Sequence, residues 1–369
     1  MPFESGSISF CVYKFEEDLP EDHLELFESK AACSIDKIKE EPTEGWVARH
    51  LLERKINDVT AYVGDYLTLQ YRTAVKKIPA SLMKAECAQR ELALMQAENF
   101  STLSRKKKKE IKEEVQELLI KDMPPQLSGV QFVVDKAAKL IYVGCSSIKQ
   151  ADNFIQFFIE TLDVECLPLT SQELCNEALG EGSFYNIDLL DFTGKGIMDE
   201  GTEKFIGRDF LIWIWYLTEQ EESKFVVPDL GEFEIGIDGP LTLVAENFGA
   251  FESVLRKGLP TKSPEAHMAL QAGKKLKSAQ IMLGRADEFW TLTFDADNFI
   301  FKSVKLPDGE ALEAVSKFEE RLESLYTFQK AFFHLYSIFL QSMHGDDSEE
   351  NLQAVQTWVQ SRKFHFPES

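Results

Sequence analysis

The chain has 369 residues, 44% of them hydrophobic and 28% charged, and a formal net charge of −22. This length suits two or three domains, and the composition is typical of a folded protein rather than a disordered chain. No apolar run approaches the ~20 residues of a membrane-spanning helix. The N-terminus lacks a basic segment followed by an apolar one, so we expect a cytoplasmic protein.

The N-terminal part is predicted to form strands around one short helix. Apolar and polar residues alternate over residues 7–15 and 66–74, which is typical of strands. Between them we expect a short helix over residues 21–30 and a loop around residues 40–46.

The next segment is predicted to be a helical hairpin. Pro79 starts a helix that runs to about residue 98, and Ser101 or Ser104 caps a second helix that ends before Pro124. An apolar stripe on the second helix comprises Ile111, Val115, Leu118 and Leu119. We expect this stripe to pack on the first helix, which leaves the basic run at residues 105–109 exposed.

Residues 129–170 are predicted to form an α+β unit. Strands over residues 130–134 and 140–145 precede a helix, and a strand over residues 164–169 follows it. The apolar face of the helix comprises Ile148, Ala151, Ile155 and Phe158.

The C-terminal half adds a buried helix and a β-meander. Residues 205–217 are apolar almost all round, which predicts a buried helix. Strands over residues 279–285, 289–294 and 299–305 are predicted to pair in sequence. Helices mixed with antiparallel pairings indicate an α+β fold with antiparallel or mixed sheets, rather than a doubly wound one.

A long helix is predicted over about residues 309–343, before an acidic turn at residues 345–350 and a short final helix. Its apolar stripe comprises Val315, Phe318, Leu322, Leu325, Phe328, Phe332, Leu335 and Phe339. Such a stripe suits packing onto its own domain, or an interface between two copies. A homodimer is expected, because one helix rarely leaves so many aromatic residues in water; they are Phe328, Phe332, Phe333, Tyr336 and Phe339.

The basic residues are unevenly distributed along the chain. Residues 71–112 contain eleven Lys and Arg against four Glu, a local charge of +7, so the remaining residues carry −29. A basic segment in an acidic protein can hold DNA on one face while the rest of the surface repels it.

The candidate DNA-binding residues are Arg72, Lys76, Lys77, Arg105, Lys106, Lys107, Lys108, Lys109, Arg256, Lys257, Lys274, Lys275 and Lys277. These side chains can neutralise phosphates. The sequence contains no helix-turn-helix, zinc-finger or RNA-recognition signature, so binding without sequence preference is expected.

Signatures of an active site are scarce. GxSxG, HExxH and Walker A strings are absent, and Gly194-Lys195-Gly196 is interpreted as a turn. The scattered cysteines have no CxxC spacing, so we expect reduced, mostly buried thiols and no metal or cofactor. A metal-dependent nuclease is an alternative, and its candidate residues are Asp287, Glu288, Asp295, Asp297 and Lys302. The carboxylates fall where hairpin turns are expected, which explains them without a metal.

Several segments resemble the RdgC family of recombination-associated bacterial proteins. They read GWV at residues 45–47, YLTLQYR from residue 66, KIP at residues 77–79, SRKKKKEIKEEVQELL from residue 104, and QFVVDKAAKLIYVGCSSIKQADNFIQFFIETLDVECLPLT from residue 131. A second block, from ESVLRKGLPTKSPEAHMALQAGKK to the strand ending in KLP at residue 307, is also similar.

The resemblance implies a horseshoe-shaped subunit, of which two copies meet at both ends to form a ring around duplex DNA. It implies a nucleoid-associated protein that limits strand exchange by a RecA-type recombinase. Three features depart from the family pattern: an enlarged segment over residues 170–250, a longer C-terminal helix, and the residues 123–127 in place of a family aromatic residue. An acidic interaction scaffold without DNA affinity is the remaining alternative.

These expectations divide the chain into five segments. Residues 1–78 and 129–170 form a central α+β domain, residues 79–128 its basic hairpin tip, residues 171–250 an insert, and residues 251–369 the meander and C-terminal helical base.

Overall fold

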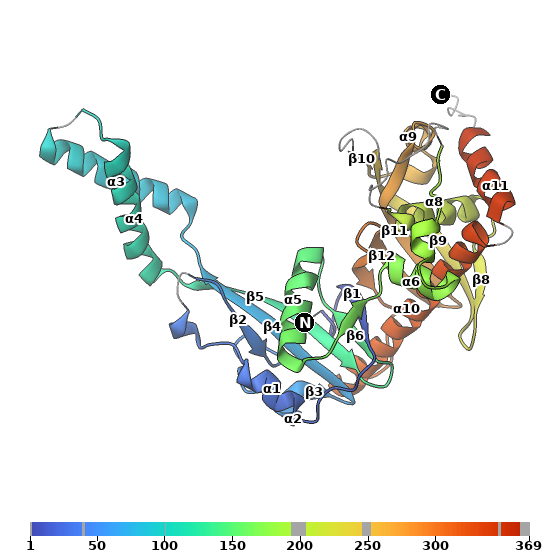
Figure 1. Ribbon diagram of the computed structural model, residues 1–369, viewed down its shortest axis with the longest axis horizontal. Coiled ribbons are helices and arrows are strands. Elements are labelled where there is room, and N and C mark those ends of the chain that lie inside the picture. The colour runs from blue at the N-terminus through green and yellow to red at the C-terminus, as the bar shows by residue number, and fades with distance from the viewer. Residues whose placement is uncertain are drawn as a thin grey trace.

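The structure is a computed structural model that describes residues 2–38, 41–99, 101–192, 204–245, 252–345 and 348–361. Within these residues it contains eleven α-helices and thirteen strands, which confirms the α+β class. The chain forms an open arc, with a helical hairpin at one end and the C-terminal elements at the other (Figure 1). None of the helices within these ranges is both long and apolar enough to cross a membrane. The turn predicted at Gly194-Lys195-Gly196 lies outside the described residues.

The N-terminal part of the arc is a small sheet with helices. Its strands are β1 (Ile8–Phe15), β2 (Thr43–Val47), β3 (Tyr62–Val63), β4 (Tyr66–Lys76), β5 (Pro125–Asp135), β6 (Leu140–Val143) and β7 (Cys166–Pro168). Its helices are α1 (His23–Ser29), α2 (Asp58–Ala61) and α5 (Ile148–Leu162), and α3 (Ala80–Glu98) and α4 (Arg105–Asp122) form the hairpin between β4 and β5.

The C-terminal part adds a second sheet and more helices. Its strands are β8 (Lys224–Val227), β9 (Gly231–Ala245), β10 (Glu252–Leu255), β11 (Lys274–Arg285), β12 (Glu288–Asp295) and β13 (Ile300–Lys305). Its helices are α6 (Ser171–Leu179), α7 (Ser183–Asn186), α8 (Ile206–Glu219), α9 (Pro264–Gln271), α10 (Ala314–His344) and α11 (Ser348–Ser361). Strand β9, in the segment over residues 171–250, belongs to this part, because it pairs with β11.

Strand β1 joins the two sheets into one, with the order β10-β9-β11-β12-β13-β1-β6-β5-β4-β2. Its first residues pair antiparallel with β13, and Cys11 to Lys14 pair with β6. Because side chains alternate along a strand, Phe10 and Val12 enter the core under α8 and α10, whereas Cys11 and Tyr13 enter the core under α5. Both faces of β1 are therefore buried, and the strand forms the middle of the arc.

The predicted loop around residues 40–46 is wrong in its C-terminal half, where β2 pairs with β4. Gly45 lets this strand approach the residues after α1, because a Cβ there would lie 2.5 Å from the Cα of Ala32. The indole N–H of Trp46 donates a 2.9 Å hydrogen bond to Thr161 Oγ1 of α5. Contacts with distant segments thus make these residues a strand.

The aromatic stripe of α10 is buried within its own chain. Phe328, Phe332, Tyr336 and Phe339 are 0% exposed, and the Phe332 ring lies 4.9 Å from that of Phe294 on β12. The expectation that these residues leave aromatic surface for a second copy is therefore wrong, and Val315, at 46% exposed, does not belong to the buried stripe.

Candidate nucleic-acid interface

The hairpin of α3 and α4 stands away from the sheets on a small core of its own. The buried residues of this core are Leu103, Ile111 and Val115, and no residue of α3 is fully buried. Of the two predicted caps, Ser104 is the one that caps α4, since its Oγ accepts a 3.3 Å hydrogen bond from the Lys107 backbone N–H. Leu118 was predicted on the packed stripe but is 48% exposed, whereas its neighbour Leu119 packs against the core.

The four lysines at the start of α4 fall into two pairs with different roles. Lys107 and Lys108 reach across to α3, where they pair with Glu98 and Glu91. The Nζ atoms of Lys106 and Lys109 lie 3.9 and 3.5 Å from glutamates one turn further along α4, and their side chains are 89% and 78% exposed. Exposed pairs of this kind contribute little free energy. Phosphates can therefore compete with the glutamates for these two lysines.

The predicted cations next to the hairpin differ in accessibility. Lys77 is exposed, and Lys76 donates a 3.0 Å hydrogen bond to the Lys121 carbonyl, at the end of α4. Arg72 is only 1% exposed and donates hydrogen bonds to the carbonyls of Leu51 and Cys33. Burial lowers the pKa of its guanidinium. Arg72 therefore cannot reach a phosphate in this conformation, and its role is to tie β4 to the preceding loops.

The second group of predicted cations lies at the other end of the arc. Arg256 and Lys257 are exposed after β10, and Lys274 Nζ lies 2.6 Å from Ser253 Oγ. Lys277 is half-buried. Lys275 points the other way and is 1% exposed, with its Nζ 2.7 Å from Asp209 Oδ1 of α8. Lys275 is thus buried inside the C-terminal part and cannot contact a phosphate.

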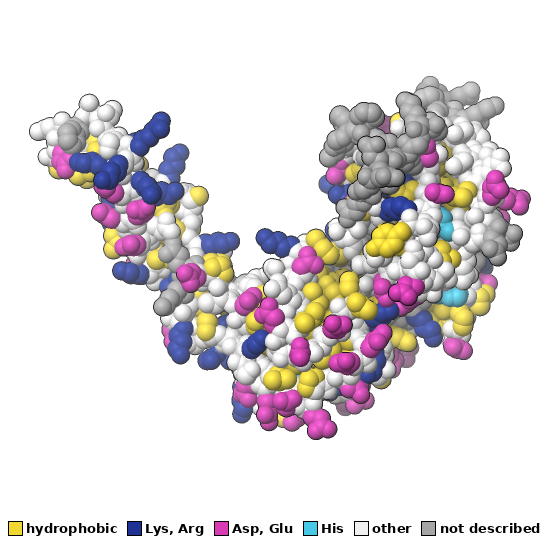
Figure 2. Space-filling view, in the orientation of Figure 1, with side chains coloured by type: hydrophobic (Ala, Val, Ile, Leu, Met, Phe, Trp, Pro, Cys, Tyr) yellow, Lys and Arg dark blue, Asp and Glu magenta, His cyan; other side chains and the backbone are white. Residues whose placement is uncertain are grey.

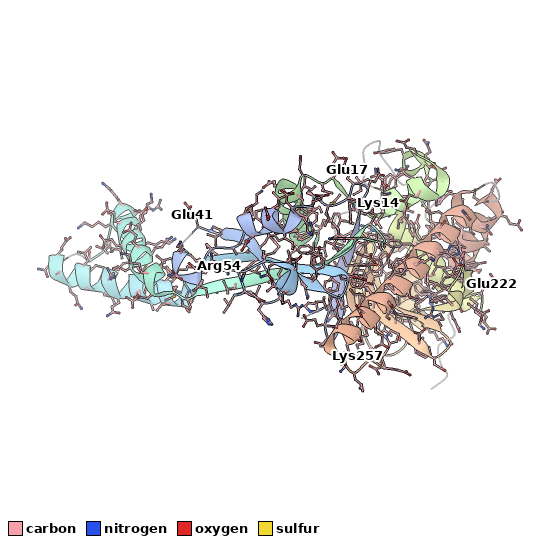
Figure 3. All side chains as sticks on the ribbon, turned by 90° about the horizontal axis from the view of Figure 1, so that it is seen from below. Lys14, Glu17, Glu41, Arg54, Glu222 and Lys257 are labelled. Carbon is pink, nitrogen blue, oxygen red and sulfur yellow. The ribbon has the colours of Figure 1, made fainter. Side chains whose placement is uncertain are left out.

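The two ends of the arc face one another across its concave side. Strand β10 lies on the side of the C-terminal part that is nearer the hairpin (Figure 1). In the space-filling view, Lys and Arg side chains project from the hairpin towards the concavity, while Asp and Glu gather along the convex edge (Figure 2). Seen from below, the hairpin and the C-terminal part, where Lys257 is labelled, lie at opposite ends of the long axis (Figure 3).

The carboxylates of the nuclease alternative do not assemble into one site. Glu288 and Asp295 stand at opposite ends of β12. Asp295 Oδ2 lies 2.6 Å from Lys302 Nζ, and both oxygens of Asp297 accept hydrogen bonds from Arg208, at 2.6 and 2.9 Å. No group of three potential metal-ligating side chains occurs in the part of the chain that the structure describes. Arg208 could not be recognised from the sequence, because its partner Asp297 lies 89 residues away.

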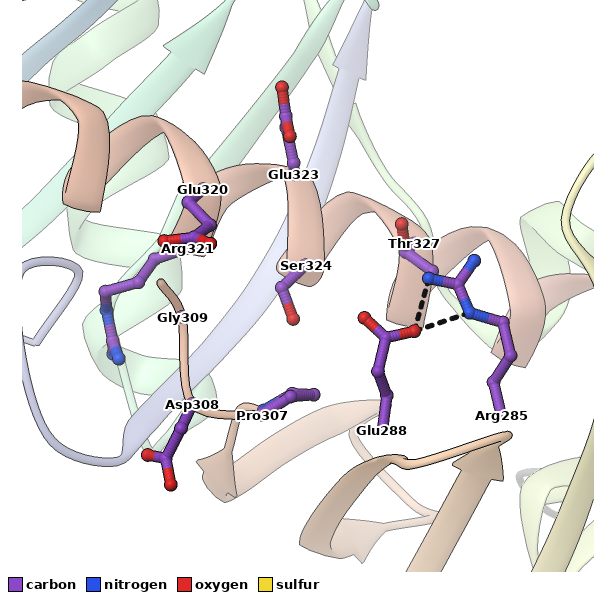
Figure 4. A pocket seen from close by; sticks show the side chains of 10 residues that line it. All are labelled: Arg285, Glu288, Pro307, Asp308, Gly309, Glu320, Arg321, Glu323, Ser324 and Thr327. Atoms are coloured by element: carbon purple, nitrogen blue, oxygen red, sulfur yellow. Dashed lines mark hydrogen bonds and ion pairs between the residues drawn. The ribbon is translucent and has the colours of Figure 1, made fainter. Parts of the chain in front are cut away.

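A polar cavity of about 260 Å³ lies between α10 and the β11–β12 turn (Figure 4). Four of its six charged groups are engaged with protein partners. Glu288 pairs with Arg285, and Glu320 accepts hydrogen bonds from the backbone N–H groups of Glu310 and Ala311, which lower the pKa of its carboxyl. Arg321 donates to the Phe3 carbonyl. These pairings hold the N-terminus and α10 together, so the cavity has a structural role.

A family model described as "RdgC: Putative exonuclease, RdgC" matches residues 9–181, from β1 through the hairpin to the end of α6. Residues 9–181 of this chain thus form an RdgC-family region. The family assignment made from the sequence is confirmed for these residues, and the match supports a recombination-associated protein. A search of curated proteins returned no match. The matched residues of this RdgC-family chain include the whole hairpin, but not the cations of β10 and β11.

Proposed function

We propose that this RdgC-family protein binds duplex DNA without sequence preference, along the concave side of the arc. The observation that carries the proposal is the placement of exposed cations at both ends of an arc whose chain has a net charge of −22. The residues proposed to contact phosphates are Lys76, Lys77, Arg105, Lys106, Lys107, Lys108, Lys109, Arg256, Lys257, Lys274 and Lys277.

The chemistry of these side chains favours phosphates over bases. Nine of the eleven side chains are lysines, which carry a compact charge on a flexible stem and lack the planar fork with which arginine reads guanine. Neutralising phosphates releases counterions from the duplex, which gives affinity that is independent of sequence and falls steeply with salt. The acidic convex side would repel a second duplex, so DNA is directed to the concave side.

We further propose that two copies close a ring around the duplex and thereby limit access of a RecA-type recombinase. One open arc leaves half of the duplex uncovered, and a second arc supplies the missing half. The hairpin offers a surface for the contact, because α3 exposes a stripe without charge. The stripe comprises Ala85, Ala88, Gln89, Leu92, Ala93 and Gln96. The aromatic residues of α10 have no part in this contact, since they are buried in their own chain.

The test combines a binding titration with a mass measurement. Two duplexes of unrelated sequence are titrated by fluorescence anisotropy over a series of salt concentrations, and the mass of the free protein and of the complex is measured by light scattering. We expect equal affinities for both duplexes, a linear fall of log affinity with log salt, and two copies on each duplex. Affinity that is insensitive to salt, or that differs more than about tenfold between the duplexes, would contradict phosphate binding. A strictly monomeric complex would contradict the ring.

A further inference from the structure

Two cysteine thiols from different strands meet in the core under α5. Cys11 lies on β1, and Cys145 follows β6 directly before the start of α5. Their Sγ atoms are 3.4 Å apart, and the two residues are only 9% and 3% exposed. A disulfide has an S–S distance of about 2.0 Å, so the two sulfur atoms must approach by roughly 1.4 Å to bond. This pair therefore needs little movement to become covalent.

The surroundings of the pair make the two thiols unequal. The hydrogen bond with Cys11 lowers the pKa of Cys145, and the backbone N–H of Ser147 adds to the effect against the opposing influence of burial and of Asp152. Ser147 is the N-cap of α5, whose first turn carries no acidic side chain. A helix N-terminus stabilises a thiolate. The same hydrogen bond, with burial, raises the pKa of Cys11, which favours Cys145 over Cys11 as the thiolate.

We propose that Cys11 and Cys145 form a dithiol site that a hydroperoxide, such as hydrogen peroxide, oxidises to an intramolecular disulfide. The Cys145 thiolate attacks one peroxide oxygen and breaks the O–O bond, which yields a sulfenic acid and a hydroxide that takes up the proton of Cys145. The Cys11 sulfur then attacks the Cys145 sulfur, forms the S–S bond and displaces a hydroxide that leaves as water with the proton of Cys11. Two thiols and one peroxide thus become one disulfide and two waters, and the sulfurs supply both electrons.

Access to the pair depends on one short turn. The residues after Cys145, Ser146 to Lys149, are all exposed. A local opening at the start of α5 is the route by which we expect a small peroxide to reach the sulfur atoms. The disulfide would tie β1 to the start of α5, and β1 is the strand that joins the two sheets of the arc. Oxidation would therefore constrain β1, the strand that connects the two ends of the arc, and these are the ends that we propose to bind DNA.

The test treats the full chain with a modest excess of hydrogen peroxide and then blocks the remaining thiols in denaturant. We expect four of the six thiols to remain reactive, a mass lower by two hydrogen atoms, and a peptide containing Cys11 linked to one containing Cys145. A reductant should reverse all three changes. If both cysteines remain free thiols, or if the linked peptides contain other cysteines, the proposal is wrong.

Two single variants test the order of the steps with a sulfenic-acid trap such as dimedone. In Cys11→Ser, Cys145 should accumulate a trapped sulfenic acid, and in Cys145→Ser, Cys11 should stay unlabelled. The opposite labelling would overturn the assignment of Cys145 as the nucleophile. Cys166→Ser is the matched control, because Cys166 is buried in the same core, has a pKa raised to about 12 by burial, and contacts the Val164 carbonyl instead of a thiol. This variant should form the disulfide as the parent does.

Discussion

Lys275 of β11 and Asp209 of α8 form an ion pair inside the C-terminal core, with both side chains 1% exposed and 2.7 Å between Nζ and Oδ1. The second oxygen of Asp209 accepts a 2.8 Å hydrogen bond from the Leu190 backbone N–H. One carboxylate thus connects a strand, a helix and the segment between α7 and α8. Removing one partner of such a pair leaves an uncompensated buried charge, whereas removing both does not.

We predict that Lys275→Met and Asp209→Leu each lower the free energy of unfolding by about 3–5 kcal/mol. The double variant should lose less than the sum, because neither side chain then leaves a charge behind, although the Leu190 N–H still lacks its acceptor. Urea denaturation of the parent and the three variants measures the coupling. Strictly additive losses would show that the two side chains do not interact energetically.

The hairpin provides a test of DNA binding that does not disturb its own packing. Lys106→Glu with Lys109→Glu changes only the lysines that pair within α4, and leaves the contacts of Lys107 and Lys108 with α3 intact. The substitutions place acidic side chains next to Glu110 and Glu113, but each such exposed pair costs only about 0.2–0.5 kcal/mol, so the circular dichroism spectrum should be unchanged. DNA affinity should fall, and the plot of log affinity against log salt should flatten by about 1.8 for each subunit that loses two phosphate contacts.

The matched control is Lys224→Glu with Lys317→Glu, which changes the net charge by the same amount. Lys224 begins β8, where it pairs with Glu232, and Lys317 is exposed on α10. Both elements lie away from the concave side (Figure 1). We expect the control to keep most of the affinity. Equal losses in both variants would mean that net charge, rather than the hairpin surface, governs binding.

Asp295 and Asp297 are predicted to matter for stability and not for strand cleavage. Asp297 forms an ion pair with the guanidinium of Arg208, which is largely buried, and Asp295 forms an ion pair with Lys302. Asp297→Ala should therefore lower the free energy of unfolding by about 3 kcal/mol or more. An end-labelled duplex should stay intact with the parent protein in Mg²⁺. Cleavage by the parent that is lost in Asp295→Asn would establish the nuclease alternative instead.

The free energy of unfolding should depend on pH because of His344, near the end of α10. Burial lowers the pKa of its imidazole and Lys204 acts in the same direction, while Asp209 and Asp188 oppose them. An unfolded histidine titrates near ~6.5, so the unfolded chain takes up a proton that the folded chain resists. The contribution of this histidine to the free energy of unfolding is then fully present above about pH 6.5. It is lost as the pH falls towards the lowered pKa of the folded state.

The measurement compares urea denaturation at about pH 7.5 and about pH 5.5. His23, whose pKa burial also lowers, contributes in the same direction, so His344→Gln should reduce the fall in unfolding free energy without abolishing it. His50→Gln changes an exposed imidazole and is the control. An unchanged fall in His344→Gln would contradict the assignment.

Local sequence signals located the hairpin closely. Pro79 precedes the first residue of α3, Ser104 caps α4, and α4 ends at Asp122, before Pro124. Each signal acts within one turn of the chain, through a fixed φ, a missing N–H or a side-chain cap, so no distant residue is needed to interpret it. The helical periodicity of α10 is also a local signal. It identified the buried stripe of this helix but not the elements that cover the stripe.

The accessibility of each cation was decided by the tertiary structure. In the sequence, nothing distinguishes the buried cations Arg72 and Lys275 from the nearby lysines Lys76 and Lys274. Arg72 is buried because the Cys33 carbonyl, 39 residues away, comes to its guanidinium, and Lys275 because α8 brings Asp209 to β11. A charge is buried only where a partner compensates for its lost hydration. In both cases that partner comes from a distant segment, which only the folded chain brings into contact.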